Sequence, residues 1–147
     1  MDTPVSALIE RKGREVHAVP STITIAEAVA EMNKKRIGCI VVLDDGRLVG
    51  IFTERDVLSR VVGAGVDPKA TLVADVMSKN VLTIRPETTV EQTMTIFAER
   101  SCRHVPVMDG GQLKGLISIG DISRWMADCS RAEADHLKNY IAGGFPA

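Results

Sequence analysis

One short pattern of residue types occurs twice in this chain and has the chemistry of a helix start or an anion site. It reads Gly-x-x-(Ser/Thr)-x-x-Asp, with Thr53 and Asp56 in the first copy and Ser118 and Asp121 in the second. A hydroxyl residue followed three positions later by an acid often begins a helix, because the hydroxyl accepts a backbone N–H and the acid suits the positive end of the helix dipole. The same arrangement offers backbone donors to an anion and a carboxylate to the two hydroxyls of a ribose. The pattern therefore favours either two ordinary helix caps or two sites for the phosphate and sugar of a nucleotide.

Each copy ends a longer stretch that predicts a strand, a helix, a hairpin of two strands and a closing helix. Capping boxes at Thr24 and Thr89 begin the first helix of each stretch, and Asp-Gly turns join the hairpin strands. In the first half we expect strands at residues 16–19, 37–43 and 48–52, and helices from 24 and over 53–62. In the second half we expect strands at 81–84, 105–108 and 113–117, and helices from 89 and over 118–127. An internal βαββα repeat thus accounts for most of the chain.

These boundaries predict a first repeat over residues 5–64, a second over 71–128 and a helical tail over 129–147. Within the tail a helix is expected over 132–141, stopped by Gly143 and Gly144. The tail's single apolar stripe suits docking either on its own domain or on a second subunit.

The composition argues against several classes of function. With 147 residues, the chain has room for one compact domain or for two small halves that share a core. Aromatic residues make up 3% and the net charge is −1, so there is neither a stacking platform nor a basic field for nucleic acid. We see no apolar run that could span a bilayer and no signal peptide, and we expect a cytoplasmic protein with no membrane partner.

The three cysteines indicate neither a metal site nor an active-site thiol. Cys39, Cys102 and Cys129 lack metal-ligand spacing, and no His, Asp or Asn lies at a suggestive distance from them in the sequence. We expect reduced, structural cysteines and no enzymatic activity.

Two such units in register resemble a tandem pair of cystathionine-β-synthase (CBS) domains of the stand-alone kind. Residues 53–56 and 103–109 look typical of these proteins, although Val41 stands where proline is usual. The resemblance implies an α+β fold in which two βαββα repeats pack sheet to sheet with pseudo-two-fold symmetry. It also implies two clefts that bind adenosine-containing ligands, with the aspartate on the ribose and the hydroxyl residue reaching phosphate.

Carried onto this chain, the resemblance assigns each cleft to residues from both repeats. One site would use Thr53, Arg55 and Asp56, with Val81, Leu82, Cys102, Arg103 and His104 opposite. The other would use Ser118 and Asp121, with Val16, His17, Ile37, Gly38 and Cys39 opposite.

The two implied sites differ in charge. Arg55, Arg103 and His104 suit the phosphate end of the first, whereas Gly120 stands in the second where the first has Arg55. We expect the Asp56 site to prefer a mono- or diphosphate, and the Asp121 site to take a bulkier or less charged ligand or to stay empty. For His17 and His104, a structural role within the fold remains an alternative.

The leading hypothesis is a non-catalytic regulatory module that binds AMP, ADP, ATP or NAD(H) and acts on an unidentified target protein in trans. The resemblance implies a homodimer as its working form. The alternative is a structural dimerisation module without a ligand. An enzyme with an acid pair is disfavoured, because the two aspartates belong to separate clefts.

Overall fold

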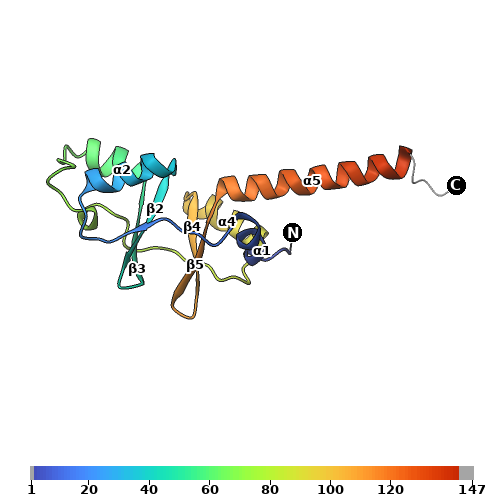
Figure 1. The fold of residues 1–147 in the computed structure, drawn as a ribbon, viewed down its shortest axis with the longest axis horizontal. Helices are drawn as coiled ribbons and strands as arrows, with labels where there is room; N and C mark the ends of the chain where they lie inside the picture. Colours follow the sequence, from blue (N-terminus) through green and yellow to red (C-terminus); the bar gives the residue numbers. More distant parts are fainter. Residues whose placement is uncertain (1, 143–147) are drawn as a thin grey trace.

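The chain folds into two similar halves, each a small sheet with helices packed against it. The computed structural model describes residues 2–142 (Figure 1). The first half contains α1 (Val5–Lys12), β1 (Ala18–Val19), α2 (Ile25–Lys35), β2 (Cys39–Asp44), β3 (Arg47–Thr53), α3 (Glu54–Asp56) and η1 (Val57–Val62). The second contains η2 (Val73–Asp75), α4 (Val90–Arg100), β4 (His104–Asp109), β5 (Gln112–Ser118) and α5 (Ile119–Ala142). The sheets have the orders β1-β2-β3 and β4-β5, which confirms the predicted α+β class with repeated units.

The two hairpins repeat each other in detail. Both are antiparallel, and both carry an irregularity at the equivalent place, between Val42 and Leu43 and between Val107 and Met108. Their turns hold two residues each with positive φ, as two-residue hairpin loops require. The hairpins lie side by side, and β3 contacts β5 (Figure 1).

The leading segment of each repeat packs on the other repeat. Val5 at the start of α1 donates its N–H to the Thr88 carbonyl, and Val90 donates to Thr3. The same pair of bonds recurs in the first half, where Val73 donates to Ile23 and Ile25 donates to Thr71. Two apolar cores result, and each holds one borrowed segment: α1 with the second repeat, and residues 73–77 with the first.

This exchange explains the glycine of the repeated pattern. A Cβ at Gly50 would lie 2.5 Å from Met77 Sδ, and a Cβ at Gly115 would lie 2.9 Å from Ile9 Cδ1. Met77 and Ile9 both belong to borrowed segments. The glycines therefore leave room for the exchanged segment to lie against the last strand of each repeat.

The sequence-based boundaries need four corrections. The first strand is only Ala18–Val19, and residues 81–84 form no strand, but make a single parallel bridge from Ile84 to Val107. The helix after Thr53 is three α-helical residues followed by a π-helix. The helices expected over 118–127 and 132–141 are one continuous helix, α5, because neither Gly nor Pro interrupts residues 128–131. The stop expected at Gly143 and Gly144 lies outside the described residues.

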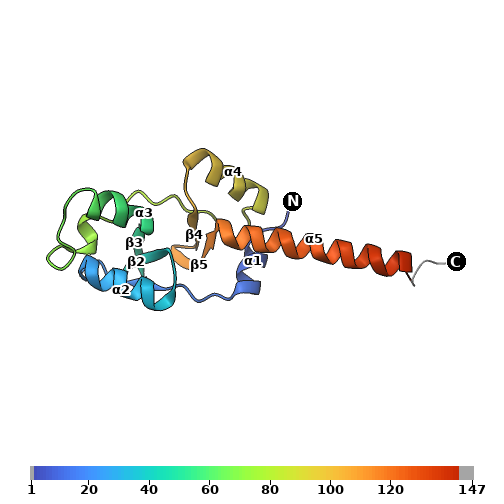
Figure 2. The ribbon, with the colours of Figure 1, turned by 90° about the horizontal axis from the view of Figure 1, so that it is seen from above.

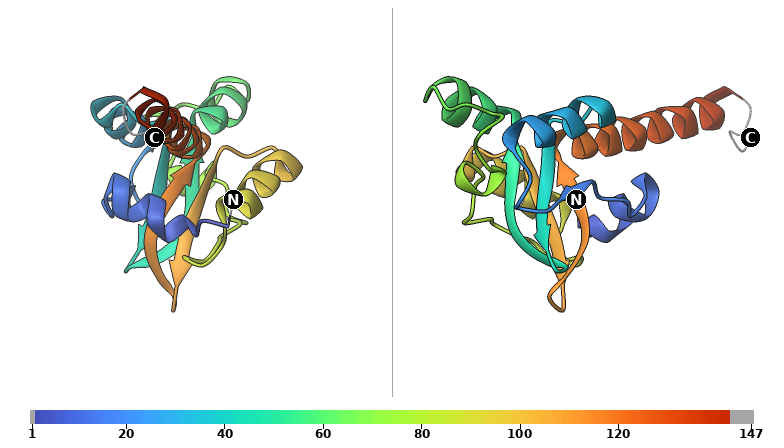
Figure 3. Two further views of the ribbon diagram at one scale, coloured as in Figure 1. Left: turned by 90° about the vertical axis from the view of Figure 1, so that its right-hand side faces the viewer. Right: turned by 60° about the vertical axis from the view of Figure 1, so that its left-hand side comes forward.

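Helix α5 leaves the body of the molecule along its second half. It extends away from both sheets in two perpendicular views (Figures 1 and 2). The right-hand view of Figure 3 shows the same projection from a third direction, and the left-hand view looks almost along α5. Every side chain from Arg131 to Lys138 is exposed. The tail therefore does not dock on its own domain over these residues.

Candidate functional site

A cleft of about 1040 Å³ opens between the two halves at the first copy of the repeated pattern. We call it the Asp56 cleft. Its walls include every residue that the resemblance assigned to the first site: Thr53, Arg55, Asp56, Val81, Leu82, Cys102, Arg103 and His104. Residues far apart in the sequence thus meet at one cavity of a size that suits a small-molecule ligand.

Asp56 is both a helix cap and part of the cleft wall. Its backbone N–H donates to Thr53 Oγ1 at 3.2 Å, and the Thr53 N–H donates to Asp56 Oδ2 at 3.0 Å. The other oxygen, Oδ1, accepts a hydrogen bond of 3.3 Å from the Ser78 hydroxyl and lies 3.7 Å from Arg60 Nε. Capping therefore uses Oδ2 alone, while Oδ1 has the longer contacts with Ser78 and Arg60.

Backbone donors at this helix start are largely used within the fold. The Glu54 N–H donates to the Gly38 carbonyl at 3.0 Å, and capping engages the N–H groups of Thr53 and Asp56. An anion in this cleft would thus depend mainly on side-chain cations. This differs from the expectation that backbone groups at the helix start would hold the phosphate.

Four arginines line the Asp56 cleft. Arg55 and Arg103 were expected from the sequence, whereas Arg60 and Arg100 were not. Arg100 is the last residue of α4, and Arg60 lies one turn after Asp56. The positions of these two helices therefore bring both arginines to the cleft. Among the described residues, only two acids share the wall, Glu54 and Asp56. The cleft therefore carries an excess of positive charge and suits an anionic ligand.

His104 lies half-buried in the cleft wall. Burial lowers its pKa below the usual value of 6.5, with smaller and opposing influences from neighbours that include Asp121 and Lys12. Its imidazole is therefore neutral at pH 7 and can donate or accept one hydrogen bond through each nitrogen.

The cysteine thiols near the pattern are poor nucleophiles. Burial raises the pKa of Cys39 to about 12, and the negative charge of Asp56 adds to this effect. Burial also raises the pKa of Cys102, which lines the cleft. Because the thiolate is the reactive form, neither residue is prepared for covalent chemistry at neutral pH.

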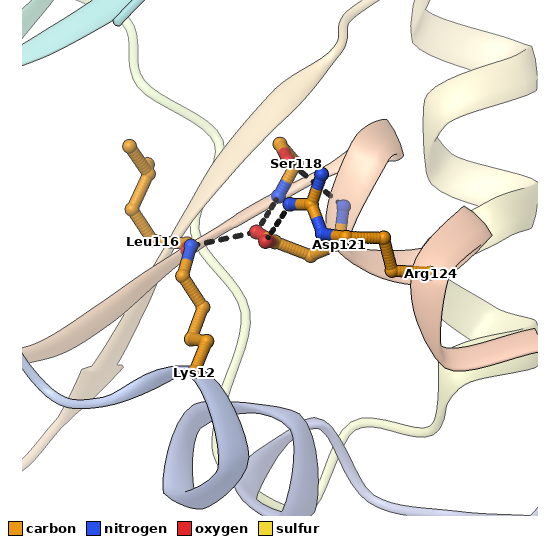
Figure 4. A network of polar contacts seen from close by, with 5 residues as sticks. All are labelled: Lys12, Leu116, Ser118, Asp121 and Arg124. Carbon is orange, nitrogen blue, oxygen red and sulfur yellow. Dashed lines mark hydrogen bonds and ion pairs between the residues drawn. The ribbon is translucent and has the colours of Figure 1, made fainter. Parts of the chain in front are cut away.

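Ser118 and Asp121 repeat the capping geometry of the first pattern. The Asp121 N–H donates to Ser118 Oγ at 3.1 Å, and the Ser118 N–H donates to Asp121 Oδ2 at 2.8 Å. Here two cations also hold the carboxylate, Lys12 Nζ at 2.7 Å from Oδ2 and Arg124 Nη2 at 2.7 Å from Oδ1 (Figure 4). Burial acts to raise the pKa of Asp121, but the bonds from Lys12, Ser118 and Arg124 outweigh it and lower the pKa.

The residues expected opposite Asp121 lie on the first repeat with differing access. Val16, His17 and Ile37 are half-buried, and the His17 carbonyl accepts a 3.2 Å bond from Val41. Cys39 is only 3% exposed. Gly38 lines the Asp56 cleft, where an added Cβ would lie 2.9 Å from Glu54 Oε1.

The fold and the repeated pattern define a pair of CBS domains. The CBS domain family matches residues 5–63 and 73–128, and the chain belongs to this family. Among curated relatives, the mitochondrial CBS domain-containing protein CBSX3 of Arabidopsis thaliana is 32% identical, over 97% of this chain and 74% of its own length.

Solved structures agree with this assignment. The CBS-domain containing protein ATU1752 from Agrobacterium tumefaciens is 41% identical, with a TM-score of 0.80 over 84% of this chain and 99% of that chain. The CBS domain pair of protein MJ0100, solved with 5-methylthioadenosine and S-adenosyl-L-methionine, is 24% identical, with a TM-score of 0.76 over 87% of this chain and 98% of that chain. This last likeness shows the fold alone.

CBS domain pairs are generally regulatory modules. Within residues 2–142, no helix has both the length and the apolar character needed to cross a bilayer.

Proposed function

We propose that this protein is a non-catalytic sensor that binds an adenine nucleotide in the Asp56 cleft. The observation that carries the proposal is the convergence of Asp56 with four arginines on one cavity between the repeats. A carboxylate suits the two hydroxyls of a ribose, and guanidinium groups suit phosphate. AMP, ADP, ATP and NAD(H) all combine these two chemical groups.

The proposed orientation follows from where charge and apolar surface lie. The phosphate end faces Arg55, Arg100 and Arg103, and the ribose lies at Asp56. The adenine ring lies against Val81 and Leu82, which form an apolar wall on the segment that crosses between the repeats. Leu82 is 40% exposed and so is available to cover a flat base.

We also propose that the protein works as a homodimer that regulates another protein in trans, within the cytoplasm. Leu58 and Val62 on η1 are each 69% exposed and lie one turn apart, which suits a helical contact between subunits. A ligand that touches both repeats would shift the arrangement for which it has the higher affinity. Val62→Asp should lower the molar mass seen in sedimentation, whereas Ala64→Asp, in the nearby exposed loop, should not. Equal masses for both variants would overturn the dimer contact.

A thermal-shift panel tests the ligand class. Ligands that bind only the folded state raise its stability in proportion to the logarithm of ligand concentration over Kd. We expect AMP, ATP or NADH to raise Tm in the wild type and to lose that effect in Asp56→Asn. S-adenosyl-L-methionine belongs in the panel because of the complex known for MJ0100, and uridine monophosphate, which keeps the ribose and the phosphate, measures what the adenine base contributes. No Tm rise with any adenine ligand would contradict the proposal and favour a structural dimerisation module.

A further inference from the structure

The carboxylate of Asp121 is held by cations on both of its oxygens. Lys12 reaches it from α1, which packs on the second repeat, and Arg124 reaches it from the next turn of α5 (Figure 4). Both distances are 2.7 Å, and the Asp121 side chain is only 6% exposed. Hydrogen bonds between two charged groups are roughly twice as strong as neutral ones. A ribose arriving at Asp121 would have to displace two charged donors and offer uncharged hydroxyls in their place, so the carboxylate would lose both counter-charges.

Asp56, at the equivalent place, is held far more loosely. In the first repeat, Ser78 donates its N–H to the Ile51 carbonyl at 2.9 Å and its hydroxyl to Asp56 at 3.3 Å. In the second repeat, Lys12 makes both connections with one ammonium, to the Leu116 carbonyl at 2.8 Å and to the aspartate. The exchanged segments therefore anchor to the two repeats at matching points, but only the second does so with a charge.

Arg124 adds to this difference. A Cβ at Gly120 would lie 3.3 Å from Arg124 Nη1 and 3.5 Å from Ser118 Oγ, so the guanidinium covers the start of the closing helix. The Arg124 side chain is 71% exposed and has few restraints, whereas that of Lys12 is 37% exposed and is held by two acceptors. Of the two cations, Lys12 is therefore the harder for a ligand to displace.

We propose that Lys12 excludes nucleotide from the Asp121 side, so that each chain takes one nucleotide, in the Asp56 cleft. Lys12 is thereby a specificity-determining residue that makes the two pseudo-equivalent sites unequal. The stoichiometry of one nucleotide per chain rests on the proposed function. The effect of removing Lys12 on binding at Asp121 does not depend on that function. Displacing Lys12 would break its 2.7 Å ion pair with Asp121, and this cost falls on any competing ligand.

Calorimetric titration with AMP tests the inference through its stoichiometry. We expect one AMP per wild-type chain, none for Asp56→Ala and two for Lys12→Met. In Lys12→Met, AMP should bind at Asp121 at least tenfold more tightly than any residual AMP binding at Asp121 in the wild type. Lys12→Met keeps the apolar stem and removes the charge. Lys114→Met is the matched control, since Lys114 is exposed on β5 and, within the part of the chain that the structure describes, its ammonium bonds to the Gln112 side chain alone. The Lys114→Met variant should still bind one AMP per chain.

The results separate this inference from the proposed function. The gained site must disappear in Lys12→Met/Asp121→Ala. Two AMP per wild-type chain, with one retained in Asp56→Ala, would overturn the inference even if Lys12→Met failed to fold. A folded Lys12→Met that still binds one AMP would overturn it too. A wild type that binds none, together with a Lys12→Met that binds one at Asp121, would support the inference and overturn the proposed Asp56 site. No binding by either folded protein would overturn both.

Discussion

Arg55 Nη1 donates a hydrogen bond of 3.2 Å to the backbone carbonyl of Ser101, across the cleft that separates the two repeats. Arg55 lies on α3 and Ser101 caps the C-terminus of α4, where its backbone is in the left-handed conformation. The contact uses one guanidinium nitrogen and leaves other donors of Arg55 for a ligand. One residue thus both bridges the repeats and supplies charge to the proposed phosphate end.

Arg55→Ala should weaken ATP binding by roughly tenfold and change adenosine binding by less than about twofold. The reason is that charge-assisted hydrogen bonds to phosphate are lost while the ribose and base contacts remain. Titration of both ligands into the folded variant measures the difference. Arg47→Ala removes the same charge at an exposed position outside the cleft and should leave both affinities unchanged. An equal loss for adenosine and ATP would show that Arg55 acts through the fold and not through phosphate.

Gly50→Ala should destabilise the protein by about 1–3 kcal/mol, the usual range for an overpacked core. The added methyl group would meet the side chain of Met77 on the segment borrowed from the other repeat. Urea unfolding of Gly50→Ala, Met77→Ala and the double variant gives the coupling between the two positions. We expect the double variant to be more stable than the sum of the single effects. Strict additivity would contradict the close approach.

His104 should make folding stability fall as the pH drops through about 6.5. Burial lowers the pKa of His104 in the folded state, so the unfolded chain binds the proton more readily. Stability is therefore full above the ordinary value of 6.5 and falls as the pH drops through it. His104→Gln should flatten this part of the profile, while His136→Gln, on the exposed part of α5, should not. Superimposable profiles for wild type and His104→Gln would contradict the burial effect.

Thiol labelling should rank the cysteines by their surroundings. Cys129 is exposed, Cys102 is half-buried in the cleft and Cys39 is buried with a pKa of about 12. With Ellman's reagent at pH 8, we expect rapid reaction of Cys129, slower reaction of Cys102, and reaction of Cys39 only after unfolding. Saturating AMP should slow Cys102 further. Protection of Cys129 instead of Cys102 by AMP would place the ligand elsewhere.

Local features were predictable from the sequence because neighbouring residues determine them. The capping box expected at Thr89 and the two-residue turns appear where the residue types require them. At Thr24 the hydroxyl caps the Glu27 N–H, but the Glu27 carboxylate bonds that hydroxyl and not the Thr24 N–H, so the expected box is incomplete. The first predicted site also came together as one cavity, since its residues follow the ends of strands and helices in both repeats.

The features that the sequence did not predict depend on which repeat each segment packs against. The exchange of α1 and residues 73–77 arises from contacts between distant parts of the chain, and no local pattern marks it. Lys12 is one of several charged residues between Glu10 and Glu15, and only the exchange of α1 brings it to Asp121. Two helices were expected in place of the continuous α5. The polar residues between them suggested a break, although no helix-breaking residue stands there.

The most direct test of the central claim is AMP affinity in wild type, Asp56→Asn and Asp45→Asn by calorimetry. Asp56→Asn keeps an oxygen for the helix cap but loses the carboxylate that we assign to the ribose, whereas Asp45 is an exposed turn residue at φ 51° that asparagine tolerates. We predict that AMP binds wild type and Asp45→Asn alike and binds Asp56→Asn at least tenfold more weakly. Equal AMP affinity in all three folded proteins would contradict the Asp56 cleft as the nucleotide site.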